Sequence, residues 1–431
     1  ASHGGASSCP GRVSRQDEVA ARMGGVRLWV AVALLVLLIG RGLCAFGEAS
    51  RDSFGSEYAN ADGKGLKIRV GAERTEVYVP RLLGRRVGLV CNHTSMVRGR
   101  RLVDTLMMLG VNVVILFTPE HGMSGRADAG EAVRDGKDQS TRVPIVSLYG
   151  KSKKPTAAHL SGVDVVVFDM QDVGVRCYTY ASTMHYMMEA CAEFGVPFML
   201  LDRPNPNGYF VDGPLLQEEY RSFIGMHPIP WVHGMTLGEL AQMVNGEGWL
   251  KNGVRCALEV VPCEHYSRGQ HYEVDVAPSP NLPTSRSILL YPTLALLEGT
   301  TLSVGRGTDW PFEVAGSPYL EERSFSFIPR PRRGAIHPPY EGKTCYGIGL
   351  MALSDSVIYA ERGILLYVLQ RLYAMRGGGH KFFTPLFDRL VGTPLLRRQL
   401  EQEVSADSIR LGWQKDIERF KKRRAPYLLY E

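Results

Sequence analysis

One stretch restricts the fold more than any other part of the chain. Residues 113–117 are five consecutive apolar residues, three of them β-branched, as is typical of a strand buried on both faces of a sheet. Pro119 ends this run, because proline has no N–H to donate to a neighbouring strand. Glu120 and His121 follow, and Gly122 permits a sharp turn. Ligands bind at the carboxyl ends of strands in open α/β sheets, so the stretch predicts an acid at a binding site.

Apolar strands and helical or looped crossovers alternate between residues 86 and 201. This order predicts the α/β class, with a Rossmann-like, doubly wound parallel sheet. A further strand is expected at 258–261, and helices are expected at 364–373 and 409–420, with the basic residues 421–424 solvated at the end of the last one. The five strands predicted first are 86–91, 111–117, 144–148, 163–168 and 198–201.

Polar side chains follow each of these five strands, which a purely structural strand does not require. Because the strands are predicted to be parallel, their carboxyl ends meet at one edge of the sheet, where a binding site is expected. The residues at these ends are Asn92 and His93, Glu120 and His121, Tyr149, Asp169, Gln171 and Asp172, and Asp202 and Arg203.

Four segments are expected along the chain. Residues 28–39 form an apolar run after basic residues, and the run is too short to span a bilayer, which favours a cleaved signal peptide. We therefore expect an exported protein, periplasmic or secreted, without a transmembrane helix in the mature chain. Cys44 is a candidate lipid-anchor site, although residues 41–43 match a lipobox poorly. The segments are upstream residues and signal peptide at 1–45, a linker at 46–65, a Rossmann-like catalytic domain at 66–265 and a smaller C-terminal α/β domain at 266–431.

Several cofactor and partner classes lack support in the sequence. The first strand is followed by Cys91-Asn92-His93-Thr94-Ser95, not by a Gly-x-Gly-x-x-Gly fingerprint, and no Walker A motif is present, so no nucleotide cofactor is expected. The histidines lack His-Glu-x-x-His spacing, so no metal site is expected. A net charge of +6 over 431 residues gives no reason to expect nucleic-acid binding. The cysteines after residue 45 are expected to be buried free thiols.

Glu120 is the leading candidate for catalysis. Glycoside hydrolysis uses a carboxylic acid to protonate the leaving oxygen, commonly with a second group as base or nucleophile. Asp172 or Glu313 could be that second group. A structural alternative is that Glu120 caps a helix or pairs with an arginine. Arginine forks bind carboxylates in bidentate fashion, and the candidates for such a clamp are Arg176, Arg203 and Arg306, the first two of which could instead form structural ion pairs.

Several motifs in fixed order resemble the NamZ-like exo-β-N-acetylmuramidases, a bacterial glycoside hydrolase family. The resemblance covers the chain from about residue 66 to its end. The motifs are GLVCNHTS at 88–95, FTPEHG at 117–122, VFDMQDVG at 167–174, LDRPNP at 201–206, HGMT at 233–236 and PSPNLPT at 278–284.

The resemblance implies a site between a Rossmann-like domain and a smaller C-terminal domain, and release of N-acetylmuramic acid from the non-reducing end of peptidoglycan fragments. It places the family's proposed catalytic glutamate on Glu120, which we expect to act as general acid/base. His121 and Asp172 are further catalytic candidates, and the acetamido group of the substrate is another candidate for the second catalytic group. Two rival functions are a metal-dependent cell-envelope amidase or esterase and a non-catalytic muropeptide-binding protein. The expected substrate-binding residues are Asn92, His93, Tyr149, Asp169, Gln171, Arg176, Tyr178, Asp202, Arg203, Asn205, His233, Asn281, Glu298, Arg306 and Glu313.

Overall fold

A seven-stranded sheet lies at the centre of the computed structural model, which describes residues 67–120, 122–123, 135–150, 152–377 and 379–431. The predicted signal peptide, linker, Cys44 and His121 lie outside the described residues. The strand order is β11-β8-β7-β1-β4-β6-β5, and every pair is parallel except β5 with β6. The strands are β1 (Arg86–Cys91), β4 (Asn112–Thr118), β5 (Gly136–Lys137), β6 (Pro144–Ser147), β7 (Val165–Asp169), β8 (Phe198–Leu201) and β11 (Leu258–Val261).

This order confirms the predicted doubly wound sheet. Starting from β1, the chain adds β4 and β6 on one side and then returns to add β7, β8 and β11 on the other. The order therefore reverses between β1 and β7, and such a switch point opens a crevice at the carboxyl ends of the strands. The five strands predicted first all form, with small shifts such as 165–169 in place of 163–168.

Helices cover both faces of the sheet. Alternate residues of each strand point to opposite faces, so Val90, Phe168 and Leu200 pack in one core and Leu89 and Val167 in the other. The first core includes side chains of α5 and α6, and the second includes side chains of α2 and α3. The helices of this part are α2 (Thr75–Leu82), α3 (Leu102–Met108), α4 (Ala157–Leu160), α5 (Tyr180–Phe194) and α6 (Leu237–Gly246), with 3-10 turns η1 (Gly71–Glu73), η2 (Glu218–Tyr220) and η3 (Lys251–Gly253).

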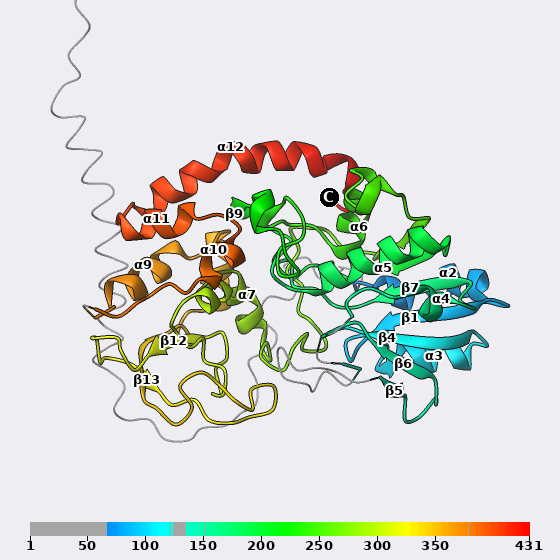
Figure 1. Ribbon diagram of the computed structural model, residues 1–431, viewed down its shortest axis with the longest axis horizontal. Helices are drawn as coiled ribbons and strands as arrows, with labels where there is room; N and C mark the ends of the chain where they lie inside the picture. Colours follow the sequence, from blue (N-terminus) through cyan, green and yellow to red (C-terminus); the bar gives the residue numbers. More distant parts are fainter. Residues whose placement is uncertain (1–66, 121, 124–134, 151, 378) are drawn as a thin grey trace, which may run out of the picture. The chain divides into compact units, whose positions relative to one another are not determined.

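The C-terminal part is mainly helical and shares the first core. Its long last helix ends beside α6, where the chain also ends (Figure 1). The helices are α7 (Ser285–Leu294), α8 (Asp355–Glu361), α9 (Leu366–Ala374), α10 (Leu386–Val391), α11 (Leu395–Glu401) and α12 (Ala406–Arg424), with 3-10 turns η4 (Ala295–Gly299) and η5 (Ala425–Tyr427). The small sheets pair β2 (Met96–Val97) with β3 (Arg100–Arg101), β9 (Asp212–Leu215) with β10 (Pro230–Val232), and β14 (Cys345–Gly349) with both β12 (Val314–Ser317) and β13 (Ser326–Phe327).

The described residues belong to one compact unit, Leu66–Glu431. The division at residue 266 stays a prediction. Among the described helices, none combines the length and apolarity needed to cross a membrane. The six described cysteines are buried free thiols, as the sequence predicted.

Candidate active site

A cavity of about 310 Å³ opens at the carboxyl edge of the sheet, beside the switch point. The Rossmann-like part contributes Glu120 after β4, Tyr149 after β6, and Tyr178 to Tyr180 at the start of α5. Because α7, η4 and α10 bring further groups to the same space, the wall comes from both parts of the chain. The lining residues are Glu120, Tyr149, Cys177, Tyr178, Thr179, Tyr180, Phe223, Ile224, Ser279, Leu282, Tyr291, Glu298, Arg306, Phe312, Leu386 and Leu390.

Glu120 lies in this wall because β4 stops just before it. The strand ends at Thr118, and a turn follows in which the N–H of Gly122 donates to the carbonyl of Pro119 at 3.1 Å. The Glu120 side chain is partly buried, and its Oε2 accepts a hydrogen bond from Thr179 Oγ1 at 3.0 Å. Burial, the charge of Glu120 and a hydrogen bond to Glu120 together raise the pKa of Tyr149. Two hydroxyl groups therefore hold the orientation of this carboxyl group.

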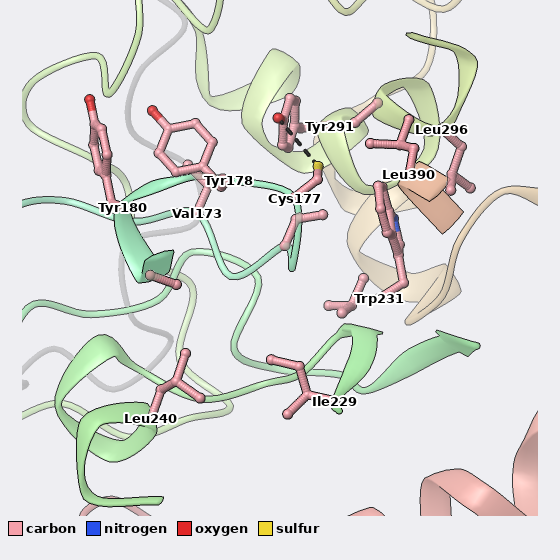
Figure 2. Close-up of a cluster of buried hydrophobic side chains, with 14 of the residues drawn as sticks. Val173, Cys177, Tyr178, Tyr180, Ile229, Trp231, Leu240, Tyr291, Leu296 and Leu390 are labelled. Carbon is pink, nitrogen blue, oxygen red and sulfur yellow. Dashed lines mark hydrogen bonds between the residues drawn. The ribbon is translucent and has the colours of Figure 1, made fainter. Parts of the chain in front are cut away.

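Tyrosine rings form one side of the cavity. Figure 2 shows Tyr178 between Tyr180 and Tyr291, with ring centroids 4.8 Å and 5.9 Å away in edge-to-face packing. The hydroxyls of Tyr178 and Tyr180 donate to the carbonyl of Pro278 at 2.9 Å and 3.3 Å. Asn92 Nδ2 donates to the Tyr180 hydroxyl at 2.8 Å, so Asn92 acts on the cavity through Tyr180. This side of the cavity is thus aromatic, and hydrogen bonds hold the hydroxyl groups of its tyrosines in place.

An ion pair faces this aromatic wall. Arg306 Nε and Nη2 donate to Glu298 Oε1 at 3.0 Å and 2.7 Å, and the guanidinium carbon lies 5.0 Å from the centre of the Phe312 ring. Burial alone would lower the pKa of Arg306, but the charges of Glu298 and Glu120 raise it above its usual value. The arginine therefore stays charged within reach of both acids.

Phe312 supports the arginine from a backbone conformation that bulky residues rarely adopt. Its φ is +57°, in the left-handed region, and its side chain is almost fully buried. The ring packs edge-on against Tyr291 at 4.9 Å between centroids. Residues held in such conformations are common at functional sites, because the surrounding contacts maintain a required placement.

Five of the predicted site residues line the cavity: Glu120, Tyr149, Tyr178, Glu298 and Arg306. Asp172 lies outside the lining set, after β7. Its Oδ1 accepts from the N–H of Gly174 at 2.7 Å, and its buried Oδ2 receives no hydrogen bond from the described residues. Burial raises the pKa of Asp172 from 3.8 to about 7, although hydrogen bonds from the backbone oppose this. Asp172 contributes to the electrostatic surroundings of Tyr178 and Tyr180.

Other predicted residues after β1, β7 and β8 hold the edge of the sheet together. Both guanidinium nitrogens Nε and Nη2 of Arg203 bind the buried carboxylate of Asp169, at 2.6 Å and 2.9 Å. Gln171 Nε2 donates to the carbonyls of Asp172 and Pro204, both at 2.8 Å. His93 Nε2 lies 2.8 Å from the carbonyl oxygen of Ala277. The fork of Arg203 is therefore already occupied by an internal carboxylate.

Arg176 is also occupied by protein groups. Its Nη1 donates to the carbonyls of Pro214 and Ile229 at 2.8 Å and 2.7 Å, and its Nη2 contacts the carbonyl of Val391. Burial lowers its pKa to about 9. This arginine joins the β9–β10 hairpin to the end of α10.

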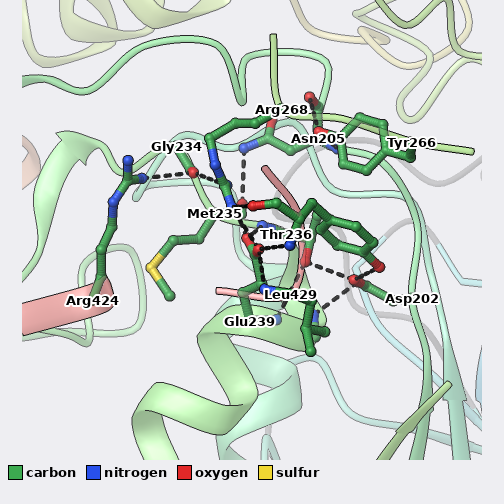
Figure 3. Close-up of polar contacts among 12 residues, drawn as sticks. Asp202, Asn205, Gly234, Met235, Thr236, Glu239, Tyr266, Arg268, Arg424 and Leu429 are labelled. Atoms are coloured by element: carbon green, nitrogen blue, oxygen red, sulfur yellow. Dashed lines mark hydrogen bonds and ion pairs between the residues drawn. The ribbon is translucent and has the colours of Figure 1, made fainter. Parts of the chain in front are cut away.

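Asp202 lies beside the C-terminal end of the chain and the start of α6 (Figure 3). Asp202 Oδ2 accepts from Thr236 Oγ1 at 2.6 Å and from the Tyr430 hydroxyl at 2.7 Å, while Oδ1 accepts from the N–H of Gly238 at 2.8 Å. Burial raises the pKa of Asp202 to about 6. It therefore holds the start of α6 and the C-terminal residues, whose N–H groups at Leu429 and Tyr430 bind Glu239.

The remaining predicted residues have structural contacts as well. Asn205 Nδ2 donates to the carbonyl of Met235 at 2.8 Å, and Asn281 Nδ2 donates to that of Gly334 at 2.7 Å. His233 is buried, which lowers its pKa to about 3. Glu313 Oε1 accepts from Thr284 Oγ1 at 2.6 Å, beside the start of α7. These groups are not among those that line the described cavity.

Several lining residues were absent from the predicted set. Thr179 and Tyr180 directly follow the predicted Tyr178 in the sequence, so that prediction already indicated this part of the chain. Tyr291 and Phe312 lie in the distant C-terminal part, and their apolar sequence context is that of ordinary core residues. Only the tertiary packing brings them to Glu120.

Comparisons with known proteins match both parts of the chain to one family. Family models described as the N-terminal and C-terminal parts of the exo-beta-N-acetylmuramidase NamZ match residues 87–286 and 289–430. The chain is 38% identical over 413 residues to the peptidoglycan beta-N-acetylmuramidase NamZ of Bacillus subtilis, covering 90% of this chain and 98% of that protein.

Two crystal structures from Bacteroides fragilis, both of DUF1343 family proteins, share the fold. One is 45% identical to this chain with a TM-score of 0.79, and the match covers 85% of this chain and 99% of the Bacteroides chain. The other is 30% identical with a TM-score of 0.71 and covers 84% and 99%.

Proposed function

The chain belongs to the NamZ family of exo-β-N-acetylmuramidases, and we propose that it removes N-acetylmuramic acid from the non-reducing ends of peptidoglycan fragments. The observation that carries the proposal is the position of Glu120, a hydroxyl-oriented carboxyl group in the wall of a cavity built by both family segments. The Bacillus subtilis relative is named as a peptidoglycan beta-N-acetylmuramidase, and the match to it covers 90% of this chain.

Glu120 acts as the general acid and then as the general base. As acid, it gives its proton to the glycosidic oxygen while the bond from that oxygen to the sugar C1 breaks. As base, the resulting carboxylate takes a proton from water, whose oxygen bonds to C1. The hydroxyl groups of Thr179 and Tyr149 orient the carboxyl group that transfers this proton.

The acetamido oxygen of the substrate is the second reacting group in this proposal. It attacks C1 as the leaving oxygen departs, and water later displaces it. Asp172 and Glu313, the other candidates, are not in the described cavity wall. Glu298 is in the wall, but its carboxylate is bound to Arg306. The expected product therefore keeps the β configuration.

Arg306 gives the site its preference for N-acetylmuramic acid. That sugar carries a lactyl carboxylate, and a guanidinium group binds carboxylates through parallel N–H groups. Arg203, the other candidate, already binds Asp169 with two nitrogens. Arg306 lines the cavity and uses Nε and Nη2 on one oxygen of Glu298, so its Nη1 is directed to the substrate in this proposal.

Export fits a substrate in the cell wall. We infer from the apolar run at 28–39 that the protein is exported, and Cys44 is a candidate for lipid attachment. Mass measurement of the protein purified from its native envelope would show cleavage near residue 45, with or without added lipid. A mature protein that begins upstream of residue 28 would contradict export by this signal.

The direct test of Glu120 is hydrolysis of p-nitrophenyl β-N-acetylmuramide. We expect Glu120→Gln to lower kcat at least about 100-fold while the protein stays folded, because general acid catalysis contributes on the order of 10²–10⁴. Glu218→Gln is the matched control, since the Glu218 side chain is 76% exposed and outside the cavity. Equal activity of wild type and Glu120→Gln would overturn the assignment. Loss of wild-type activity in a chelator would instead favour a metal-dependent hydrolase.

A further inference from the structure

Trp310 is an exposed indole on a loop that builds the cavity. The loop between η4 and β12 contributes Arg306 and Phe312 to the cavity wall, and Trp310 lies between them in the sequence with 42% of its surface exposed. Residues two apart have Cα atoms at most about 7 Å apart, so the Trp310 backbone lies close to the wall residue Phe312.

The backbone around Trp310 is fixed by local hydrogen bonds. Thr308 Oγ1 donates to the carbonyl of Gly305 at 2.7 Å and accepts from the N–H of Trp310 at 3.0 Å. The carbonyl of Trp310 accepts from the N–H of Glu313 at 3.0 Å. Gly307 has a φ of +81°, and a Cβ there would lie 2.6 Å from the carbonyl oxygen of Arg330. The loop thus has one favoured conformation.

A neighbouring loop holds this one at the cavity rim. The N–H of Arg330 donates to the carbonyl of Gly307 at 2.8 Å, and Arg332 forms an ion pair with Asp309. The same neighbouring loop accepts the hydrogen bond from Asn281, which lies between the cavity-lining residues Ser279 and Leu282 in the sequence. Trp310 is therefore held beside the cavity and outside it.

The size of the cavity indicates which part of the substrate would lie near Trp310. At about 310 Å³ it is at the lower end of ligand pockets, which span roughly 300–1,000 Å³. It therefore suits the single terminal sugar that an exo-acting enzyme removes, and the next sugar of the glycan must lie at the rim. We propose that Trp310 forms the leaving-group subsite, with its indole stacked on the sugar that follows the scissile bond. This inference rests on the proposed function.

The stacking contact predicts how binding depends on the second sugar. Two uncleavable probes separate the subsites: the methyl thioglycoside of N-acetylmuramic acid, and N-acetylmuramic acid joined through sulfur to N-acetylglucosamine. In calorimetric titrations the wild type should bind the disaccharide about three- to tenfold more tightly than the monosaccharide, as expected for one aromatic contact. Trp310→Ala should reduce this ratio to below about twofold without changing monosaccharide affinity, and Trp310→Phe should retain most of it.

Tyr367→Ala is the control, because Tyr367 is an aromatic residue of similar exposure, 40%, on α9. If Trp310→Ala keeps the full preference for the disaccharide, the subsite assignment is wrong while the proposed function stands. If wild type binds the monosaccharide but gains nothing from the second sugar, the assignment is also wrong. If wild type binds neither probe, the proposed function fails, and this inference fails with it.

Discussion

Thr179 connects the start of α5 to the reacting acid. It lies at the N-cap of α5, but its side chain caps no helical N–H and instead donates to Glu120 Oε2. Without this bond, the Glu120 carboxyl group loses one of the two hydroxyl groups that hold its orientation. The placement of Glu120 in the cavity therefore depends on a residue with no acid–base chemistry of its own.

We expect Thr179→Val to lower kcat about tenfold with little change in KM, because one hydrogen bond contributes about 1 kcal/mol. Thr179→Ser keeps the hydroxyl and should retain nearly full activity. Steady-state kinetics on p-nitrophenyl β-N-acetylmuramide would measure both. If Thr179→Val and Thr179→Ser have the same kcat, the orienting role is excluded.

Asp172 makes stability depend on pH. Its pKa is raised from 3.8 to about 7 by burial, so the folded chain holds a proton that the unfolded chain loses at lower pH. The stabilisation is therefore fully present below about pH 4 and is lost as the pH rises through 7. Between the two pKa values, the free energy of unfolding can change by at most about 1.4 kcal/mol for each pH unit.

Asp172→Asn should remove this dependence. From pH 5 to pH 8 the free energy of unfolding of wild type should fall by about 1–3 kcal/mol relative to the variant, as measured by urea titration. Asp416→Asn, at a half-exposed position of α12, serves as control and should follow the wild type. Parallel curves for Asp172→Asn and wild type would show that Asp172 is ionised throughout this range.

At the scale of elements, the parallel strands could be predicted because each is a short apolar run with a polar end. Strands that are buried on both faces need such apolar runs. The helices that lie between β1 and β8 in the sequence alternate with these strands. The 3-10 turn η4 and the loop before β12 carry no comparable periodicity. The sequence therefore predicted the Glu120 side of the cavity better than the Tyr291 and Phe312 side.

The end of the last helix differs from what the sequence predicted. Residues 421–424 were expected to be solvated, but Arg424 is buried and its Nη1 donates to the carbonyls of His233 and Gly234 at 2.6 Å and 2.7 Å. That expectation was wrong for Arg424, because a basic residue at a helix end can bind distant carbonyl groups that local sequence does not reveal.

The C-terminal residues stabilise the Rossmann-like part. The Tyr430 hydroxyl donates to Asp202 and accepts from the N–H of Cys263 at 2.9 Å. We expect Tyr430→Phe to lower the free energy of unfolding by about 2–3 kcal/mol, because two buried groups lose a partner. Tyr427→Phe is the matched control: its hydroxyl binds Glu247, whose side chain is 20% exposed, and the loss should be below about 1 kcal/mol. Equal urea midpoints for the two variants would contradict this role.

At the scale of the whole molecule, the cavity requires both halves of the chain. Glu120 and its orienting hydroxyls come from the sheet, while Glu298, Arg306 and Phe312 come from the C-terminal part. The resemblance of ordered motifs predicted the family, which the matches over residues 87–286 and 289–430 confirm. The detailed contacts could not be predicted, since they depend on how the two parts pack in the shared core.

Mass spectrometry of a peptidoglycan fragment that ends in N-acetylmuramic acid tests the central claim most directly. Wild type should release free N-acetylmuramic acid and leave a fragment shorter by one sugar, while Glu120→Gln should leave the fragment intact. A fragment recovered uncleaved from wild type would indicate a binding protein, and release of peptide without sugar would indicate an amidase. Either result would contradict an exo-acting muramidase that uses Glu120.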